Sequence, residues 1–195
     1  MVVVKIGGSL QSTKYIKKWI NSIRSNGNTS FLIIFGGGQY ADKIREEQKI
    51  KKYDDYEAHK LAIDGMRRLT SDNLKNLKGF DVINSLEDIK KNNKKRKLMI
   101  WMPSVEEINS FNIPLNWSAT SDTIALSVSK KINSPLLIIK SFGFGKIKYI
   151  TSFFLKKNIL DDYFANNYLN NSQYISLTSK DKHYMLRKIC KKFIY

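Results

Sequence analysis

Two glycines near the start of the chain lie where a strand-forming segment ends, in a pattern that suits anion binding. Gly7 and Gly8, followed by Ser9, come directly after the apolar run 2–6, which also contains Lys5. Consecutive glycines let the backbone turn tightly and point N–H groups toward one anion. A lysine ammonium near the turn adds positive charge. The chemistry that these residue types favour is the binding of a phosphate group.

Two later segments show a related pattern. Gly36, Gly37 and Gly38 follow a second apolar run, and Lys140 with Ser141 follows a third. Three consecutive glycines lower the stability of a fold, so they are expected where another group must come close to the backbone. A phosphate or a small anion is the expected neighbour. A lysine at the end of a strand is usually only solvated. The occurrence of all three segments at strand ends is what favours a shared anion site.

Asp122 is the best candidate for a functional carboxylate. It follows Thr120 and Ser121 at the predicted start of a helix, where an ordinary helix cap would also explain it. The two histidines and the single cysteine have no spacing that predicts a zinc site. The motifs GxxxxGK[ST] and GxGxxG are both missing from the sequence, which disfavours a P-loop nucleoside triphosphatase and a dinucleotide-binding dehydrogenase.

Alternating strand and helix signals must position these residues. Buried β-branched or apolar runs predict strands, and apolar residues spaced at three and four predict helices. Such alternation indicates an open three-layer αβα sandwich on a mostly parallel sheet, in which ligands lie outside the carboxyl ends of the strands. Strands are predicted at 2–6, 31–35, 80–83, 98–101, 136–139 and 174–177, and helices at 13–24, 40–49, 55–77, from 85, from 120, at 152–169 and at 180–193.

Composition narrows the class of protein. The 195 residues suit one domain, and no stretch is apolar enough to predict a membrane span or a signal peptide. One cysteine is consistent with a reducing compartment, so we expect a cytoplasmic protein. Only six of the 34 basic residues are arginine, so the net charge of +17 rests on lysine. Nucleic-acid sites favour arginine, and the lysine excess is better explained by AT-rich codon usage.

The sequence resembles the amino acid kinase family, which includes acetylglutamate, aspartate, carbamate and uridylate kinases. It resembles most a subfamily of short kinases of methanofuran-type cofactor synthesis. The resemblance is carried, nearly along the whole chain, by 5–9, 36–42 with Arg45, Ala58 and His59 with Met66, 101–104, 117–122, 139–141 and 159–161.

The resemblance implies roles for the residues singled out above. Lys5 and Lys140 look like the lysines that neutralise charge on a transferring phosphoryl group, and Asp122 like the aspartate that orients them. Gly7, Gly8, Ser9 and Ser141 would bind phosphate or nucleotide. The residues that would bind the acceptor are Gly36, Gly37, Gly38, His59, Thr120 and Ser121. For His59, a buried and hydrogen-bonded histidine without this role is an equally simple interpretation.

The resemblance also implies a reaction and its components. ATP with Mg²⁺ would phosphorylate a small anionic acceptor, in the subfamily an aminomethylfuran-methyl phosphate that becomes a diphosphate. The acceptor half would cover roughly 1–118 and a short nucleotide half roughly 119–195 of a single domain, in a protein that forms homo-oligomers. From the lysine bias and the lack of a long apolar stretch, we expect binding neither to nucleic acid nor to membranes. No metal ligand is predicted.

Two departures from the family leave alternatives open. The family usually has an Asp-Gly pair shortly after the strand that ends at Lys140, but here Ser141 is followed by Phe142 and glycines without a carboxylate. A later glycine-rich segment with a lysine is also missing. A kinase of another acceptor, such as a carboxylate or a nucleoside monophosphate, is the first alternative. A non-catalytic ligand-binding protein with the same fold is the second.

Overall fold

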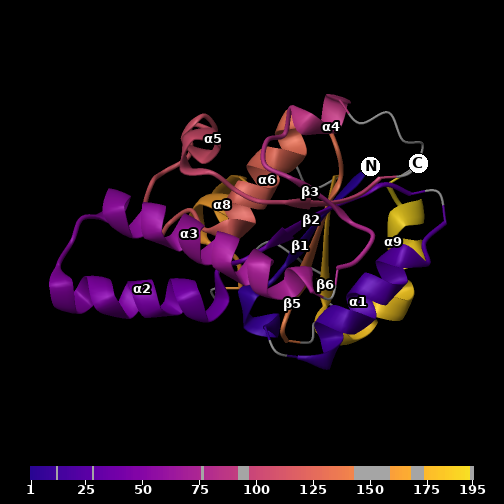
Figure 1. The fold of residues 1–195 in the computed structure, drawn as a ribbon, viewed down its shortest axis with the longest axis horizontal. Helices are drawn as coiled ribbons and strands as arrows, with labels where there is room; N and C mark the ends of the chain where they lie inside the picture. The colour runs from indigo at the N-terminus through magenta and orange to yellow at the C-terminus, as the bar shows by residue number, and fades with distance from the viewer. Residues whose placement is uncertain are drawn as a thin grey trace.

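The computed structural model describes residues 1–11, 13–27, 29–75, 77–91, 97–142, 159–167 and 174–193. Its strands form one six-stranded sheet in the order β3-β4-β2-β1-β5-β6, with every pairing parallel. Helices cover both faces of this sheet (Figure 1), so the predicted three-layer α/β sandwich is confirmed. The strands are β1 (Val2–Ile6), β2 (Phe31–Phe35), β3 (Asp81–Ile83), β4 (Leu98–Trp101), β5 (Leu136–Lys140) and β6 (Ile175–Ser179).

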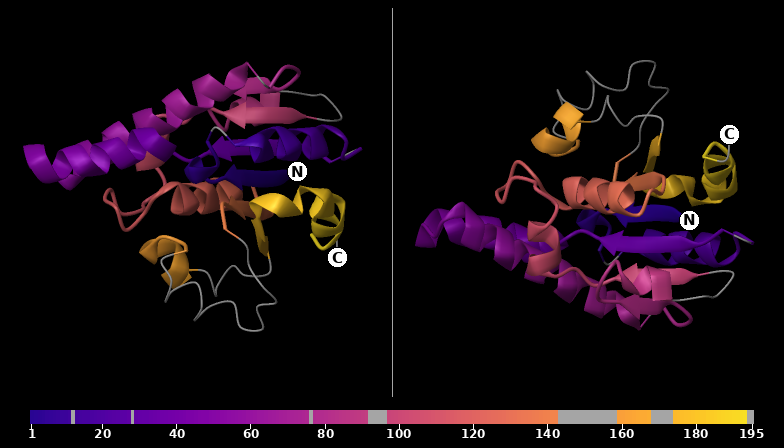
Figure 2. Two further views of the ribbon diagram at one scale, coloured as in Figure 1. Left: turned by 90° about the horizontal axis from the view of Figure 1, so that it is seen from below. Right: turned by 90° about the horizontal axis from the view of Figure 1, so that it is seen from above.

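The helices lie in two layers, which Figure 2 shows from opposite sides. The layer of α3, α5, α6 and α8 packs on one face, and α1 with α9 packs on the other. The helical elements are η1 (Gly8–Leu10), α1 (Lys14–Arg24), α2 (Gly38–Lys51), α3 (Asp55–Leu74), α4 (Asp88–Lys91), α5 (Val105–Asn109), α6 (Ser121–Lys131), α8 (Asp162–Asn167), η3 (Lys180–Met185) and α9 (Leu186–Lys191).

The central strands alternate between the two cores. Val3 of β1 and Ile138 of β5 pack with α3 and α6, whereas Val2, Val4 and Leu137 pack with α1 and α9. Successive side chains of a strand point to opposite faces, and both faces are covered by helices, so every position of β1 and β2 is buried. This alternation decides on which face a polar residue in these strands must lie.

Some predicted elements differ from the structure. The short helix α5 was not predicted, because five residues are too few to show helical periodicity; its N-cap Ser104 accepts a hydrogen bond from the Glu107 amide at 3.1 Å. The predicted helix 180–193 is a 3₁₀ segment, η3, followed by α9. Of the predicted helix 152–169, the described part is α8, and 152–158 and 168–169 lie outside the described residues.

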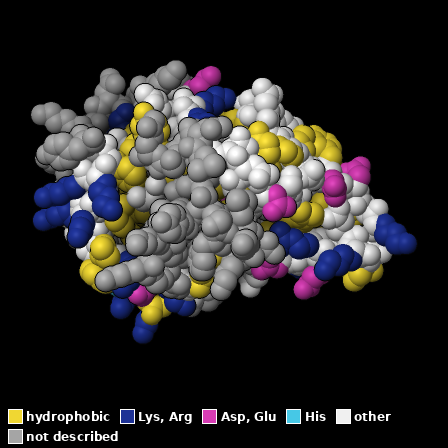
Figure 3. All heavy atoms as spheres, turned by 180° about the vertical axis from the view of Figure 1, so that it is seen from behind, with side chains coloured by type: hydrophobic (Ala, Val, Ile, Leu, Met, Phe, Trp, Pro, Cys, Tyr) yellow, Lys and Arg dark blue, Asp and Glu magenta, His cyan; other side chains and the backbone are white. Residues whose placement is uncertain are grey.

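Charge is distributed unevenly over the surface. Helices α1 and α9 contain seven lysines and arginines and no acidic residue. Figure 3, seen from behind, shows basic side chains gathered at the end where these helices lie, while both signs mix at the opposite end. None of the described helices is long and apolar enough to cross a membrane.

Candidate active site

The two glycine turns after β1 and β2 pack directly on each other. A Cβ atom on Gly8 would lie 2.2 Å from the Gly38 amide nitrogen and 2.5 Å from its Cα, distances that only glycine allows. Gly38 also has a φ of +51°, in the left-handed region that favours glycine. The glycines are therefore needed for the close contact between the two turns. The sequence did not reveal that the turns are neighbours.

The turns also present amide groups for which the described residues offer no acceptor. Among the described residues, the backbone N–H groups of Gly8, Ser9, Gly37 and Gly38 donate no hydrogen bond. Four such amides at the carboxyl edge of a parallel sheet form a concave site suited to an anion. We call these four residues the amide cradle.

Gly7 and Gly36, predicted to bind phosphate and acceptor, have a different position. The Gly7 amide donates to the Ile139 carbonyl at 3.0 Å, and the Gly36 amide donates to the Ile6 carbonyl at 3.0 Å. Both N–H groups extend the sheet hydrogen bonding by one residue, so neither is free for an anion. The turn from sheet to cradle begins one residue later than the sequence suggested.

Lys5, Lys140 and Asp122 converge beside this cradle. Lys5 in β1 and Lys140 in β5 point to the same face as Val3 and Ile138, because they follow those residues by two positions. The first turn of α6 covers this face and carries Asp122. The Asp122 carboxylate lies 2.7 Å from the Lys5 Nζ and 2.5 Å from the Lys140 Nζ.

Burial gives this lysine–aspartate cluster unusual electrostatics. Burial alone raises the pKa of Asp122, but the ammonium groups of Lys140 and Lys5 outweigh it and lower the pKa to about 2. Burial also lowers the pKa of Lys5, against the attraction of Asp122. Two ammonium groups share one carboxylate, and within the described part of the chain neither lysine has another ion pair. The cluster is suited to a further negative charge.

Asp161 holds the start of α6 in place, and its role was not predicted. Its carboxylate accepts hydrogen bonds from the amide and hydroxyl of Thr120, both at 2.8 Å, and from the amide and hydroxyl of Thr123, at 3.1 and 2.5 Å. It also accepts from the Phe164 amide at 2.8 Å, which caps α8. The cap of α6 thus comes from Asp161, which leaves the Asp122 carboxylate free to bind the lysines.

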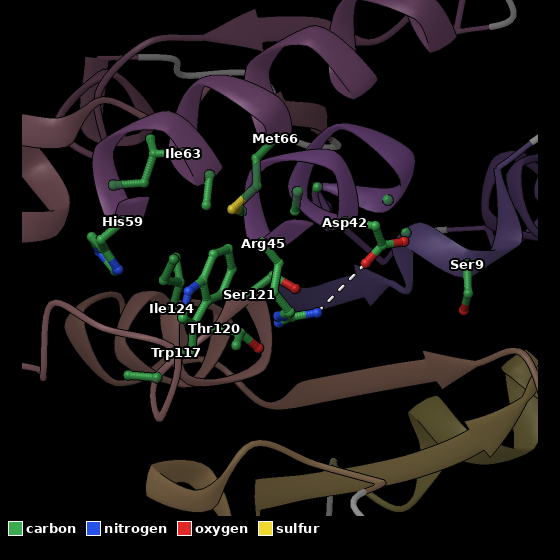
Figure 4. Close-up of a pocket in the computed structure, with 16 residues that line it drawn as sticks. Ser9, Asp42, Arg45, His59, Ile63, Met66, Trp117, Thr120, Ser121 and Ile124 are labelled. Atoms are coloured by element: carbon green, nitrogen blue, oxygen red, sulfur yellow. Dashed lines mark ion pairs between the residues drawn. The ribbon is translucent and has the colours of Figure 1, made fainter. Parts of the chain in front are cut away.

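A pocket of about 190 Å³ opens next to the amide cradle (Figure 4). It is bounded by the cradle, by α2 and α3, and by the segment that leads into α6. We call it the glycine pocket. It is lined by Gly8, Ser9, Gly37, Gly38, Ala41, Asp42, Arg45, His59, Ala62, Ile63, Met66, Trp117, Ala119, Thr120, Ser121 and Ile124.

Thr120, Ser121 and His59 line this pocket, as predicted for the acceptor site, although their role stays a prediction. The Ser121 hydroxyl would lie 2.9 Å from a Cβ on Gly36, so the start of α6 contacts the second glycine turn. Ser141 is half-buried directly after Lys140, and no described contact gives it a ligand role.

An arginine–tryptophan pair was missed by the sequence reasoning. The Arg45 guanidinium lies 4.3 Å from the centre of the Trp117 ring, and its Nη1 is 3.6 Å from an Asp42 carboxylate oxygen. Figure 4 shows Arg45 beside Trp117, with a dashed line from Arg45 to Asp42. The Trp117 Nε1 donates to the Gln48 side chain at 2.6 Å. The only signal was the presence of these residues in segments that resemble the family.

The residues fit phosphate groups better than a protein-held metal. No group of three or more His, Cys, Asp or Glu side chains that could hold a metal ion occurs among the described residues. The lysine–aspartate cluster and the cradle, in contrast, offer ammonium and amide groups to phosphate oxygens. Magnesium commonly binds through substrate phosphates with few protein ligands, so Mg²⁺ would come with the nucleotide.

A known kinase is similar to this chain in sequence, and solved kinase structures are similar to it in fold. No protein-family model matches the chain. The chain is 30% identical over 142 residues to [5-(aminomethyl)furan-3-yl]methyl phosphate kinase of Methanocaldococcus jannaschii, a match that covers 71% of the chain and 64% of that relative's length.

Solved structures agree with this relationship at the level of the fold. The UMP kinase from Bacillus anthracis has a TM-score of 0.67 at 17% identity, covering 97% of this chain and 91% of that one. The uridylate kinase from Archaeoglobus fulgidus has a TM-score of 0.68 at 14% identity, covering 96% and 95%. The chain therefore has the fold of these uridylate kinases, and it is similar in sequence to the furan phosphate kinase over 64%, less than two thirds, of that relative's length.

Proposed function

We propose that the protein is an ATP-dependent phosphotransferase that phosphorylates a small phosphomonoester to its diphosphate. The observation that carries this proposal is the buried lysine–aspartate cluster beside the amide cradle. Burying the Lys5 ammonium group and most of the Lys140 side chain is costly and needs a compensating role, and binding a phosphoryl group in transit is such a role.

In this reaction an oxygen of the acceptor phosphate attacks the terminal phosphorus of ATP, the bond from that phosphorus to the bridging oxygen breaks, and ADP leaves. Negative charge spreads over the transferring oxygens and the bridging oxygen. Lys5 and Lys140 would stabilise that charge, and Asp122 would hold both ammonium groups in position. A phosphate oxygen is already ionised at neutral pH, so the attack needs no strong general base.

The size of the glycine pocket supports a small acceptor. Ligand pockets commonly measure about 300–1,000 Å³, and this one measures about 190 Å³. The amide cradle would bind the phosphate of the acceptor, and the apolar wall of Ile63, Met66 and Ile124 would contact its carbon skeleton. The name of the Methanocaldococcus relative gives a compound of this kind, an aminomethylfuran-methyl phosphate. We propose that compound as the acceptor and methanofuran-type cofactor synthesis as the pathway.

The proposal includes the conditions of the reaction. ATP with Mg²⁺ is the phosphoryl donor, and the cytoplasm, where ATP is abundant, is the location. That the protein forms homo-oligomers stays a prediction. A nucleoside monophosphate is the first alternative acceptor, because the uridylate kinases share the fold, but a nucleotide is large for this pocket. A carboxylate acceptor ranks after it, and a non-catalytic binding protein with this fold ranks last.

The test is a transfer assay with purified protein, Mg-ATP and a panel of acceptors. The panel contains the aminomethylfuran-methyl phosphate, UMP, a simple alkyl phosphate and acetylglutamate, and ³¹P NMR identifies the product. We expect a diphosphate signal with the furan phosphate and little with UMP. Formation of UDP, or of an acyl phosphate, would replace the proposed acceptor, and no transfer to any compound would favour a non-catalytic binding protein.

A further inference from the structure

His59 has a buried ring nitrogen for which the described part of the chain offers no hydrogen-bond partner. The residue is 5% exposed, and among the described residues its Nε2 has no donor or acceptor within reach. A buried polar atom without a partner costs free energy, and most proteins avoid it. Because His59 lines the glycine pocket, a ligand in that pocket can supply the missing partner.

His59 lies at the end of the pocket that is farther from the amide cradle. Gly65 of α3 contacts the start of α2, since a Cβ on Gly65 would lie 3.0 Å from the Tyr40 Cβ and 3.3 Å from the Ala41 amide. His59 comes six residues earlier in α3, which is about 9 Å along the helix axis. Figure 4 likewise shows His59 and the cradle residue Ser9 at opposite ends of the lining.

The polar groups of the pocket lining that the structure describes do not satisfy this nitrogen. Trp117 gives its N–H to Gln48, and Arg45 pairs with Asp42 and stacks on Trp117. The rest of the wall is largely apolar. The Arg45–Asp42 pair has no net charge, so it does not repel a cationic group of a ligand.

Burial lowers the pKa of the His59 imidazole, so the ring is neutral at physiological pH. A neutral imidazole has one nitrogen that accepts a hydrogen bond, and a ligand amine can donate to it. An imidazole that stayed protonated would repel an ammonium group instead.

We propose that His59 is a specificity-determining residue that accepts a hydrogen bond from an amino group at the end of the acceptor opposite its phosphate. The pocket thereby selects short phosphomonoesters that carry an amine. This inference rests on the proposed function, since the cradle is taken to bind the phosphate. The acceptor named for the Methanocaldococcus relative has an aminomethyl group in addition to its methyl phosphate.

The experiment compares two acceptors that differ only in this group. One is [5-(aminomethyl)furan-3-yl]methyl phosphate, and the other has a methyl in place of the aminomethyl. The ratio of their kcat/KM values is measured in the unmodified protein, in His59→Phe and in His59→Gln. Ile63→Val, which trims the apolar wall, is the matched control, and thermal unfolding verifies that each variant is folded.

We expect the unmodified protein to prefer the amine by about 10- to 100-fold, the usual effect of leaving a buried hydrogen-bonding group unpaired. His59→Phe should lose this preference while still phosphorylating the methyl compound. His59→Gln, whose amide oxygen can accept, should retain part of it. Ile63→Val should change both rates alike and keep the ratio.

Equal use of both compounds by the unmodified protein, or an undiminished preference in His59→Phe, would overturn the inference while the proposed function stands. Calorimetric titration with the same two compounds, without ATP, separates the remaining case. A preference for the amine that depends on His59, with no transfer, supports the inference and refutes the proposed function. Binding of neither compound refutes the inference.

Discussion

Replacement of Lys5 by methionine tests the proposed mechanism most directly. Methionine keeps most of the apolar stem of the lysine, so β1 stays packed, and it removes only the ammonium group that lies 2.7 Å from Asp122. Lys140 remains 2.5 Å from the same carboxylate. The variant therefore exchanges a cluster with an excess ammonium group for a neutral pair.

The structure sets the expected magnitudes. Removing one partner of a buried ion pair commonly costs about 3–5 kcal/mol. Here Lys140 still neutralises Asp122, and the cost of burying the Lys5 ammonium disappears, so we expect a smaller loss of unfolding free energy, about 1–2 kcal/mol. The loss of a charge-stabilising donor should lower the rate of transfer by about 10²–10³. Lys140→Ala should have a similar effect on rate, and the double variant less than the product of both.

The assay is single-turnover transfer from labelled Mg-ATP to the acceptor, measured by rapid quench at saturating acceptor. Lys17→Met is the matched control, since Lys17 is exposed on α1, and its rate should stay within about twofold of normal. Circular dichroism and urea unfolding report whether each variant is folded. A folded Lys5→Met protein with a near-normal rate would refute the mechanism and favour a non-catalytic binding protein.

Three further predictions concern stability and binding. Folding lowers the pKa of Asp122 from 3.8 to about 2, so its ionisation should contribute about 2 kcal/mol to the unfolding free energy above pH about 4. This contribution is lost as the pH falls toward 2. Urea unfolding of the unmodified protein and of Asp122→Asn from pH 2 to 5 would show it. Asp161→Ala should lower the unfolding free energy by about 2–3 kcal/mol and slow transfer about tenfold, because it removes the cap of α6 and of α8. The control is Asp162→Ala, since Asp162 is the exposed neighbour. Equal unfolding free energies for the two variants would be evidence against the capping role of Asp161. Despite the net charge of +17, binding to duplex or single-stranded nucleic acid should be weak and should vanish with added salt. Electrophoretic mobility shifts can measure this binding. Submicromolar binding near physiological salt would contradict the prediction.

The sheet was the most predictable part of the fold. The observed bounds of β1, β2 and β4 match the predicted ones, because each is a largely apolar run, interrupted only by Lys5 in β1, that ends at glycine or shortly before proline. The parallel orientation of the strands also followed from their alternation with helices. The short elements η1 and α5 were not predictable, since three to five residues carry no periodic signal.

The site was predictable only where it depends on backbone chemistry or on the family resemblance. The glycine turns and the strand-end lysines can be read from sequence, because their residue types are unusual at such positions. The cap from Asp161 could not be read, since it joins groups 38 and 41 residues apart in the chain. The stacking of Arg45 on Trp117 likewise depends on how α2 meets the segment before α6.

The placement of Lys5 and Lys140 on one face of the sheet has a consequence for how this chain can change length in evolution. Residues added or lost between the strands leave that placement intact, so loops and helices are free to vary. One residue added within β1 between Val3 and Lys5 would turn the ammonium group to the face covered by α1, away from Asp122. Insertions in related sequences should therefore avoid these strand segments, or come in pairs that restore the alternation.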